Sequence, residues 1–88
     1  MKRFDKDPDA VLSYTMDWSK WLGSDTISTS TWVLEDGITN NSDSNTTTAA
    51  TITLSGGTKG TNYTVTNRIT TAGGLTEDRS WIFRVKER

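Results

Sequence analysis

The chain has 88 residues, with ten basic and eleven acidic side chains and a formal net charge of −1. A chain of this length holds a single small core, and the near-zero net charge provides no global field to attract nucleic acid or an anionic membrane. Cysteine and histidine are both absent. Their absence excludes disulfides, thiolate zinc sites and every Ser–His or Cys–His catalytic arrangement. We therefore expect one non-enzymatic domain without cofactor or metal, whose partner is neither nucleic acid nor membrane.

Residues 1–10 alternate in charge around Pro8 and show neither helical nor strand periodicity. We expect an extended N-terminal arm over 1–10, followed by the folded domain over 11–88. The arm is either a solvated tail or short edge segment, or it lies across a neighbouring subunit with Phe4 as its anchor. It lacks the apolar stretch of a signal peptide, and no segment has the ~20 apolar residues of a membrane span. We therefore expect the chain to stay soluble.

Polar and apolar residues begin to alternate after residue 11, the pattern of half-buried strands. A β-branched, threonine-rich run over 26–34 predicts a second strand that can accommodate a bulge. The Glu35–Asp36–Gly37 sequence is a tight-turn signal, after which Ile38 begins a short third strand. The inward-facing residues of the first two strands are Leu12, Tyr14, Met16, Trp18, Ile27, Trp32 and Leu34.

Residues 40–47 contain only Asn, Ser, Asp and Thr. Such residues bond readily to their own backbone and add nothing to a core, so we expect a surface loop. Alternation returns on both sides of the Gly56–Gly57 and Gly60 turns, and Gly73–Gly74 predicts a hairpin before the last strand. The inward positions of these later strands are Ala50, Ile52, Leu54, Tyr63, Val65, Asn67, Trp81, Phe83 and Val85.

No segment has helical periodicity, so we expect no helix, and six or seven short strands at intervals of roughly 8–14 residues predict an all-β sandwich or small barrel. Residues 54–65 resemble the fibronectin type III pattern of a leucine, a glycine-rich turn and Thr-x-Tyr-x-Val. Tyr63 would then form a tyrosine corner, its hydroxyl bonding to upstream backbone; otherwise it is simply an aromatic on a strand. We predict an immunoglobulin-like, fibronectin type III-like antiparallel β-sandwich.

No constellation of residues supports catalysis or metal binding. Asp5, Asp7 and Asp9 resemble the start of a calcium loop, but Ala10 and Met16 stand where such a loop needs glycine and glutamate. The remaining carboxylates have no apolar pocket to separate their pKa values and are expected in solvated turns. The basic residues near the C-terminus, Arg79, Arg84, Lys86 and Arg88, are expected on a solvated face, because no exposed aromatics alternate with them.

Trp21 is the aromatic that strand alternation explains least, because it adjoins the turn at Leu22 and Gly23. It either caps the open end of the sandwich, anchors in a partner's pocket, or stacks on a sugar ring. The candidate interface residues are therefore Phe4, Trp21 and Leu22.

The runs 6–27, 30–32, 54–57, 63–69, 78–80 and 84–88 together resemble a family of small tailed-phage and prophage proteins described as fiber–tail adaptors. The resemblance implies a virion component that is assembled in the cytoplasm of the host bacterium and binds other structural proteins at the tail or neck. It supplies no catalytic residue. Weak individual contacts would then be multiplied in a homo-oligomeric ring. The alternative function is a free-standing immunoglobulin-like module for carbohydrate binding or adhesion, with Trp21 or another exposed ring as the platform.

Overall fold

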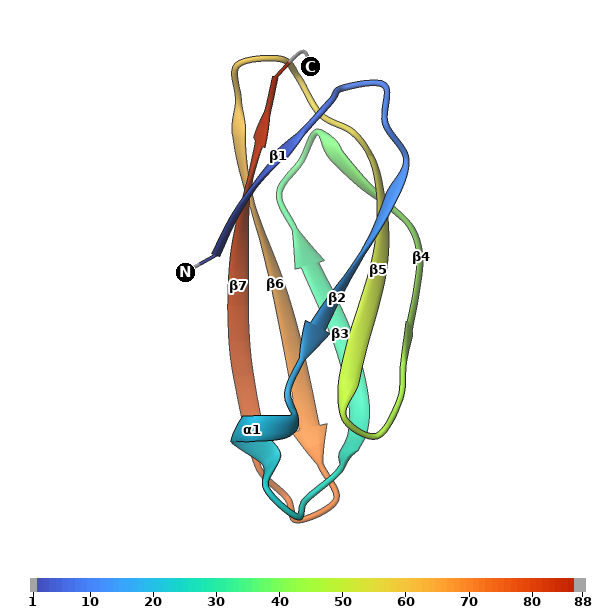
Figure 1. Cartoon of the computed structure of the whole chain (residues 1–88), viewed down its shortest axis with the longest axis vertical. Coiled ribbons are helices and arrows are strands. Elements are labelled where there is room, and N and C mark those ends of the chain that lie inside the picture. The colour runs from blue at the N-terminus through green and yellow to red at the C-terminus, as the bar shows by residue number, and fades with distance from the viewer. Residues whose placement is uncertain (1, 87–88) are drawn as a thin grey trace.

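A computed structural model of the chain describes residues 2–86 and shows two β-sheets packed face to face (Figure 1). One sheet has four strands in the order β1-β7-β6-β3, and the other has three in the order β2-β5-β4. The predicted β-sandwich is confirmed. The elements in chain order are β1 (Lys2–Lys6), β2 (Leu12–Asp17), α1 (Ser19–Leu22), β3 (Ile27–Leu34), β4 (Ile38–Asn45), β5 (Ala49–Gly56), β6 (Asn62–Thr71) and β7 (Thr76–Val85).

The sequence predicted a purely antiparallel sandwich, but the structure contains one parallel strand pair. Strand β1 runs parallel to β7, with Lys2 opposite Trp81 and Lys6 opposite Val85, whereas the other four strand pairs are antiparallel. The orders β2-β5-β4 and β7-β6-β3 are those of strands B-E-D and G-F-C in an immunoglobulin constant domain. Here, however, β1 lies beside β7 and not in the three-stranded sheet. A parallel neighbour is possible because the whole chain separates β1 from β7 in sequence.

Half of the segment expected to be an arm is an edge strand of the sandwich. The aromatic ring of Phe4 packs against Phe83 with ring centroids 5.1 Å apart. Lys6 is fully buried, and its ammonium group donates hydrogen bonds to the carbonyl oxygens of Gly56 at 2.7 Å and Asp7 at 3.0 Å. These two inward side chains attach β1 to the domain. The sequence did not predict this strand because one of its inward positions holds a lysine, so the residues do not alternate between polar and apolar.

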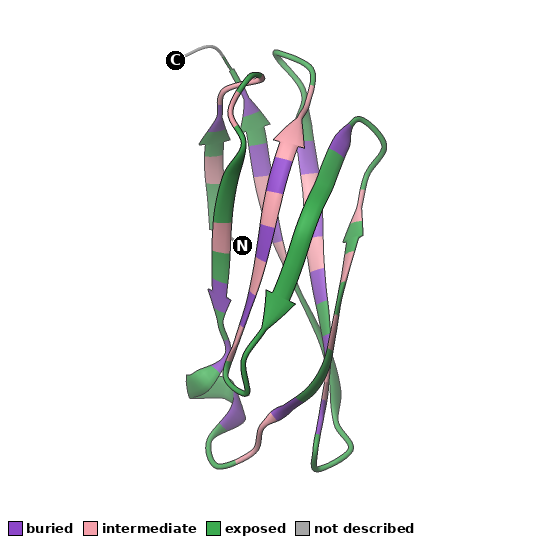
Figure 2. Ribbon diagram, turned by 90° about the vertical axis from the view of Figure 1, so that its right-hand side faces the viewer, coloured by how far each residue is buried: buried purple, intermediate pink, exposed green. Residues whose placement is uncertain are grey.

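The segment expected to be a polar loop is mostly strand β4. It pairs with β5 from Ile38 opposite Gly56 to Asn45 opposite Ala50, with a register shift between Asn40 and Ser42. Every residue of β4 after Ile38 is exposed, so the strand is green along almost its whole length in Figure 2. The loop prediction was wrong because an edge strand needs only backbone hydrogen bonds from its neighbour, and a side-chain pattern cannot report them.

The prediction that the chain has no helix was also wrong. α1 is a single turn of four residues, too short to produce helical periodicity. The carboxylate of Asp17 accepts a 2.9 Å hydrogen bond from the backbone N–H of Ser19 at its start, and Gly23 ends it with a φ of +62°. This turn closes one end of the sandwich.

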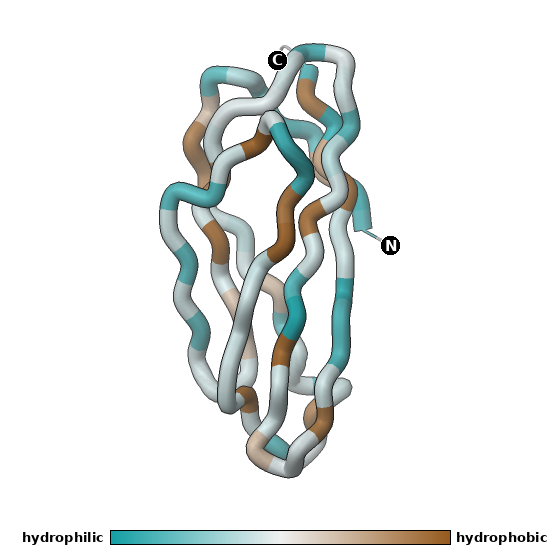
Figure 3. Tube along the Cα trace, turned by 180° about the vertical axis from the view of Figure 1, so that it is seen from behind, coloured by the Kyte–Doolittle hydropathy of each residue, from teal (hydrophilic) through white to brown (hydrophobic). Residues whose placement is uncertain are grey.

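The core lies between the sheets and is built from alternating strand residues. Figure 3 shows the same alternation as hydrophobic positions separated by polar ones along the chain. The predicted glycine turn before β4 is confirmed by the φ of +107° at Gly37, and the predicted bulge lies between Ile27 and Thr29. The buried apolar residues are Met16, Trp18, Leu22, Ile27, Ile38, Ala50, Ile52, Leu54, Tyr63, Val65, Ile69, Trp81, Phe83 and Val85.

Candidate functional site

The end of the sandwich closed by α1 carries the exposed aromatic side chain that the sequence singled out. Trp21 is 38% exposed, and its ring meets the ring of Trp18 edge to face with centroids 5.5 Å apart. Leu22, on the same helical turn, is buried in the core. In the isolated chain, therefore, Trp21 presents apolar surface at this end and Leu22 does not.

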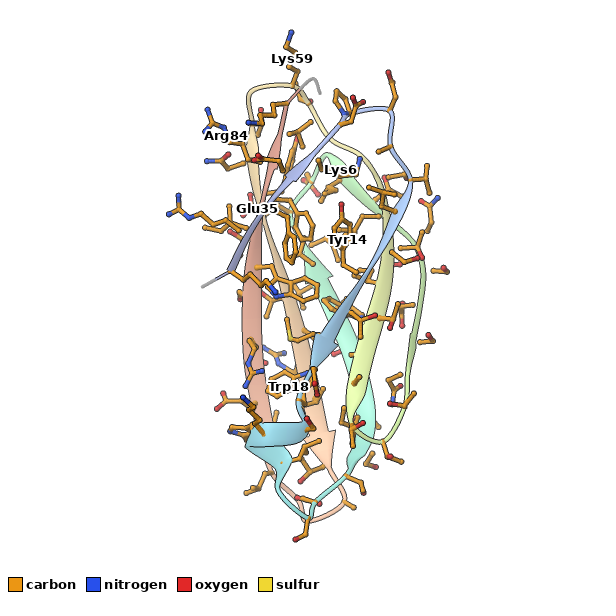
Figure 4. The ribbon with its side chains drawn as sticks, in the orientation of Figure 1. Lys6, Tyr14, Trp18, Glu35, Lys59 and Arg84 are labelled. Carbon is orange, nitrogen blue, oxygen red and sulfur yellow. The ribbon has the colours of Figure 1, made fainter. Side chains whose placement is uncertain are left out.

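Trp18 is a rigid support beneath Trp21. It is fully buried, and its indole N–H donates a 2.9 Å hydrogen bond to the side-chain oxygen of Asn67. The guanidinium of Arg79 lies 4.2 Å from the centre of the Trp18 ring and donates a 3.3 Å hydrogen bond to the carbonyl of Asp17. A cation over an indole face is attracted by the ring quadrupole. Figure 4 shows Trp18 in this position above α1.

Asn67 links Trp18 to the neighbouring strand β3. Its side chain is fully buried, and its amide nitrogen donates to the hydroxyl of Ser30 at 2.9 Å and the carbonyl of Thr31 at 3.0 Å. Strand alternation predicts that Asn67 faces inward, but not that it bonds to Trp18, because the two residues lie 49 positions apart. A buried polar side chain in a strand is the signal that could have indicated such a network.

Phe4, expected as an anchor on a neighbouring subunit, packs against its own chain. Its ring centroid lies 5.2 Å from that of Tyr14 and 5.1 Å from that of Trp81. Trp81 in turn meets Trp32 at 5.7 Å. These contacts join β1 to both sheets and leave Phe4 half-buried.

An open groove of about 490 Å³ lies between β2 and β7, next to the start of β1. Its one carboxylate belongs to Asp17, and the Ser19 backbone N–H holds the pKa of this group below its usual range. The groove therefore presents an ionised acceptor that is already hydrogen-bonded to the protein. The lining residues are Lys2, Thr15, Met16, Asp17, Arg79, Ser80 and Trp81.

The opposite end of the sandwich contains the side chain predicted to form a tyrosine corner. The buried Tyr63 hydroxyl accepts a 2.9 Å hydrogen bond from the backbone N–H of Thr58, five residues upstream. This is the backbone contact that defines the motif, although here the tyrosine oxygen acts as acceptor. Lys6 lies at the same end and points from β1 toward β5 (Figure 4). Burial lowers the pKa of its ammonium group.

The basic residues near the C-terminus differ in what they contact. Arg79 covers Trp18, Lys86 forms a 3.2 Å ion pair with Asp5, and Arg84 projects away from β7 (Figure 4); Arg88 lies outside the described residues. Within residues 2–86 there is no group of three or more metal-ligating side chains. None of the helical structure described is long and apolar enough to cross a membrane.

Comparison with known proteins adds a family assignment. The sequence model of a family described as podophage GP4 fiber-tail adaptor protein gp77 matches residues 6–84. No curated protein matches the chain. The matched region runs from the end of β1 almost to the end of β7 and so includes both sheets and α1. Because the match covers most of the sequence, the chain belongs to the podophage GP4 fiber-tail adaptor family.

Proposed function

We propose that this chain is a non-enzymatic adaptor of a tailed-phage or prophage virion, located at the tail or neck, that binds other structural proteins there. Membership of the fiber-tail adaptor family is the observation that carries this proposal. The composition supports the non-enzymatic part, since the chain has neither histidine nor cysteine.

The proposed adaptor works as a homo-oligomeric ring assembled in the cytoplasm of the host bacterium. A domain of 88 residues offers only a small contact area to each partner. Repetition around a symmetric ring raises the total affinity without any new type of contact, because each further contact becomes intramolecular.

Trp21 is the proposed anchor for a neighbouring virion protein. Tryptophan is enriched among residues that dominate binding energy, and it acts best when a supported ring enters a partner's pocket. Trp21 is suited to this role, since it is partly exposed and its ring rests on the fully buried Trp18.

Mass-spectrometric peptide mapping of purified particles tests the location. The proposal expects peptides of this chain in intact virions in a constant ratio to other tail proteins. Absence of the chain from particles that are complete and infectious would disprove the virion role.

Replacement of Trp21→Ala tests the anchor, with Lys20→Ala on the same helical turn as the matched control. We expect the Trp21 variant to fold, as judged by circular dichroism, but to be incorporated into particles at least tenfold less than the Lys20 variant. Equal incorporation of the two variants would show that Trp21 is not the anchor.

A further inference from the structure

Charge is distributed unevenly across the sandwich, although the chain as a whole is nearly neutral. Residues 21–58, which include β3, β4 and β5, carry four carboxylates and no basic side chain. We call the group formed by Asp25, Glu35, Asp36 and Asp43 the acidic side. Asp25 precedes β3, Glu35 and Asp36 follow it, and Asp43 lies on β4. These residues therefore surround strand β3.

The opposite side of the molecule has the opposite charge. Strands β1 and β7 with Lys86 carry six basic residues against three acidic ones, and we call this group the basic side. Two of its three carboxylates are paired, Asp5 with Lys86 and Asp78 with Arg68. Figure 1 shows β1 and β7 along one flank of the sandwich and β4 along the other. Five of the six basic residues are exposed, namely Lys2, Arg3, Arg79, Arg84 and Lys86, whereas Lys6 is buried.

Strand β3, the edge strand of the four-stranded sheet on the acidic side, lacks the usual protection against edge-to-edge pairing. β3 has eight residues without charge, proline or glycine, and among the described residues it pairs with β6 alone. Natural edge strands are commonly short, charged or bulged. By these criteria β1 is protected against pairing with a second β1 by its net positive charge, and β4 is protected by Asp43 and its register shift. β3 has one shift near its start, and Val33 is 53% exposed.

We infer that a second copy of this chain docks head to tail, with its basic side against the acidic side and its β1 next to β3. Both complementary surfaces are present on one chain, at the two ends of the four-stranded sheet. An uncharged strand surrounded by carboxylates also matches the usual interface, which has an uncharged centre and a polar rim. A contact of this kind repeats in one direction and generates a ring when the rotation closes. The inference deepens the proposed ring and rests on it.

A two-fold contact between two β3 strands is disfavoured by the same charges. In an antiparallel pair, the end of one β3 lies beside the start of the other. Glu35 and Asp36 of one copy would then approach Asp25 of its neighbour. Like charges placed opposite each other destabilise a strand pair. Head-to-tail docking replaces this repulsion with attraction to Lys2 and Arg3, both exposed.

Cysteine cross-linking tests the arrangement cleanly, because the chain has no cysteine of its own. Across the sheet, Val33 lies opposite Thr66 and Thr66 lies opposite Ser80. Arg3 lies opposite Ile82, two residues after Ser80 on β7. Val33 and Arg3 therefore project from the same face of the sheet at opposite edges. We expect a Val33→Cys/Arg3→Cys double variant, treated with a short bis-maleimide in purified particles, to give a ladder of covalent multimers. Each single variant should remain monomeric.

Other results would overturn the inference. Dimers of the Val33→Cys single variant would establish the two-fold contact instead. A double variant that is present in particles but gives no multimers would refute head-to-tail docking and leave the virion role intact, whereas absence of the wild-type chain from particles refutes the virion role itself. Ala72→Cys, at the exposed β6–β7 hairpin, is the negative control.

The dependence of cross-linking on salt and on charge reversal tests whether charge directs the contact. The ladder formed by the purified double variant should weaken at least threefold between roughly 0.1 M and 1 M salt, as the screening length falls from about 10 Å to about 3 Å. Asp36→Lys should weaken it similarly at low salt, and Lys2→Glu added to Asp36→Lys should restore it. A ladder insensitive to both salt and charge reversal would show that charge does not direct the contact.

Discussion

The hydrogen bond between Trp18 and Asn67 can be tested by a double-mutant cycle. Asn67→Leu keeps a side chain branched at Cγ but removes the acceptor of the buried Trp18 indole N–H and the donor to the Thr31 carbonyl. Leaving one buried polar group without a partner costs about 1–3 kcal/mol. We expect the variant to lose about 2–4 kcal/mol, a large part of the ~5–15 kcal/mol that stabilises a typical domain.

The second arm of the cycle is Trp18→Phe, which leaves the Asn67 oxygen unpaired and weakens the contact with Arg79. The double variant Trp18→Phe/Asn67→Leu contains neither member of the bond. It should therefore lose less stability than the sum of the two single variants, by about 1–3 kcal/mol.

Urea unfolding followed by far-ultraviolet circular dichroism measures all four proteins without depending on tryptophan fluorescence. The midpoint and slope together give the free energy of unfolding. If the two losses add to within about 0.5 kcal/mol, the two residues act independently. The hydrogen bond between Trp18 and Asn67 would then contribute no coupling energy to the stability of the sandwich.

Three further predictions concern the turns. Tyr63→Phe removes the acceptor of the Thr58 N–H and should lower the free energy of unfolding in urea by about 1–2 kcal/mol; an unchanged midpoint would deny the tyrosine corner a stabilising role. Hydrogen bonds from the Thr71 side chain and the Thr26 and Gly73 backbone lower the pKa of Asp25. Folding therefore favours the ionised carboxylate, and its stabilisation should be lost as pH falls from about 4 through the folded-state pKa. Asp25→Asn should flatten that acid dependence in urea melts, and an unaltered profile would contradict the assignment. Gly57→Ala should lower the melting temperature, because Gly57 has a φ of +99° and an added Cβ would lie 2.6 Å from Val85; wild-type stability would mean that this turn relaxes freely.

Strand alternation in the sequence predicted the sandwich because a strand with one buried face has an apolar residue at every second position. Tyr63, Val65, Trp81, Phe83 and Val85 were all expected to face inward, and all are buried. The glycine-rich turns were equally readable, since positive φ angles leave glycine as the favoured residue. The family resemblance was also present in the sequence and is confirmed by the match over residues 6–84.

Features that depend on contacts between elements were decided by the tertiary structure alone. β4 is a strand because β5 supplies its backbone hydrogen bonds, and β1 belongs to the four-stranded sheet because it pairs with β7 at the far end of the chain. The buried Lys6 also links β1 to the other sheet through the carbonyl of Gly56. Of the three predicted interface residues, packing left Trp21 exposed, buried Leu22 and placed Phe4 against the core. The separation of charge onto opposite sides also needed the strand order, because a linear sequence does not say which strands lie at the edges of a sheet.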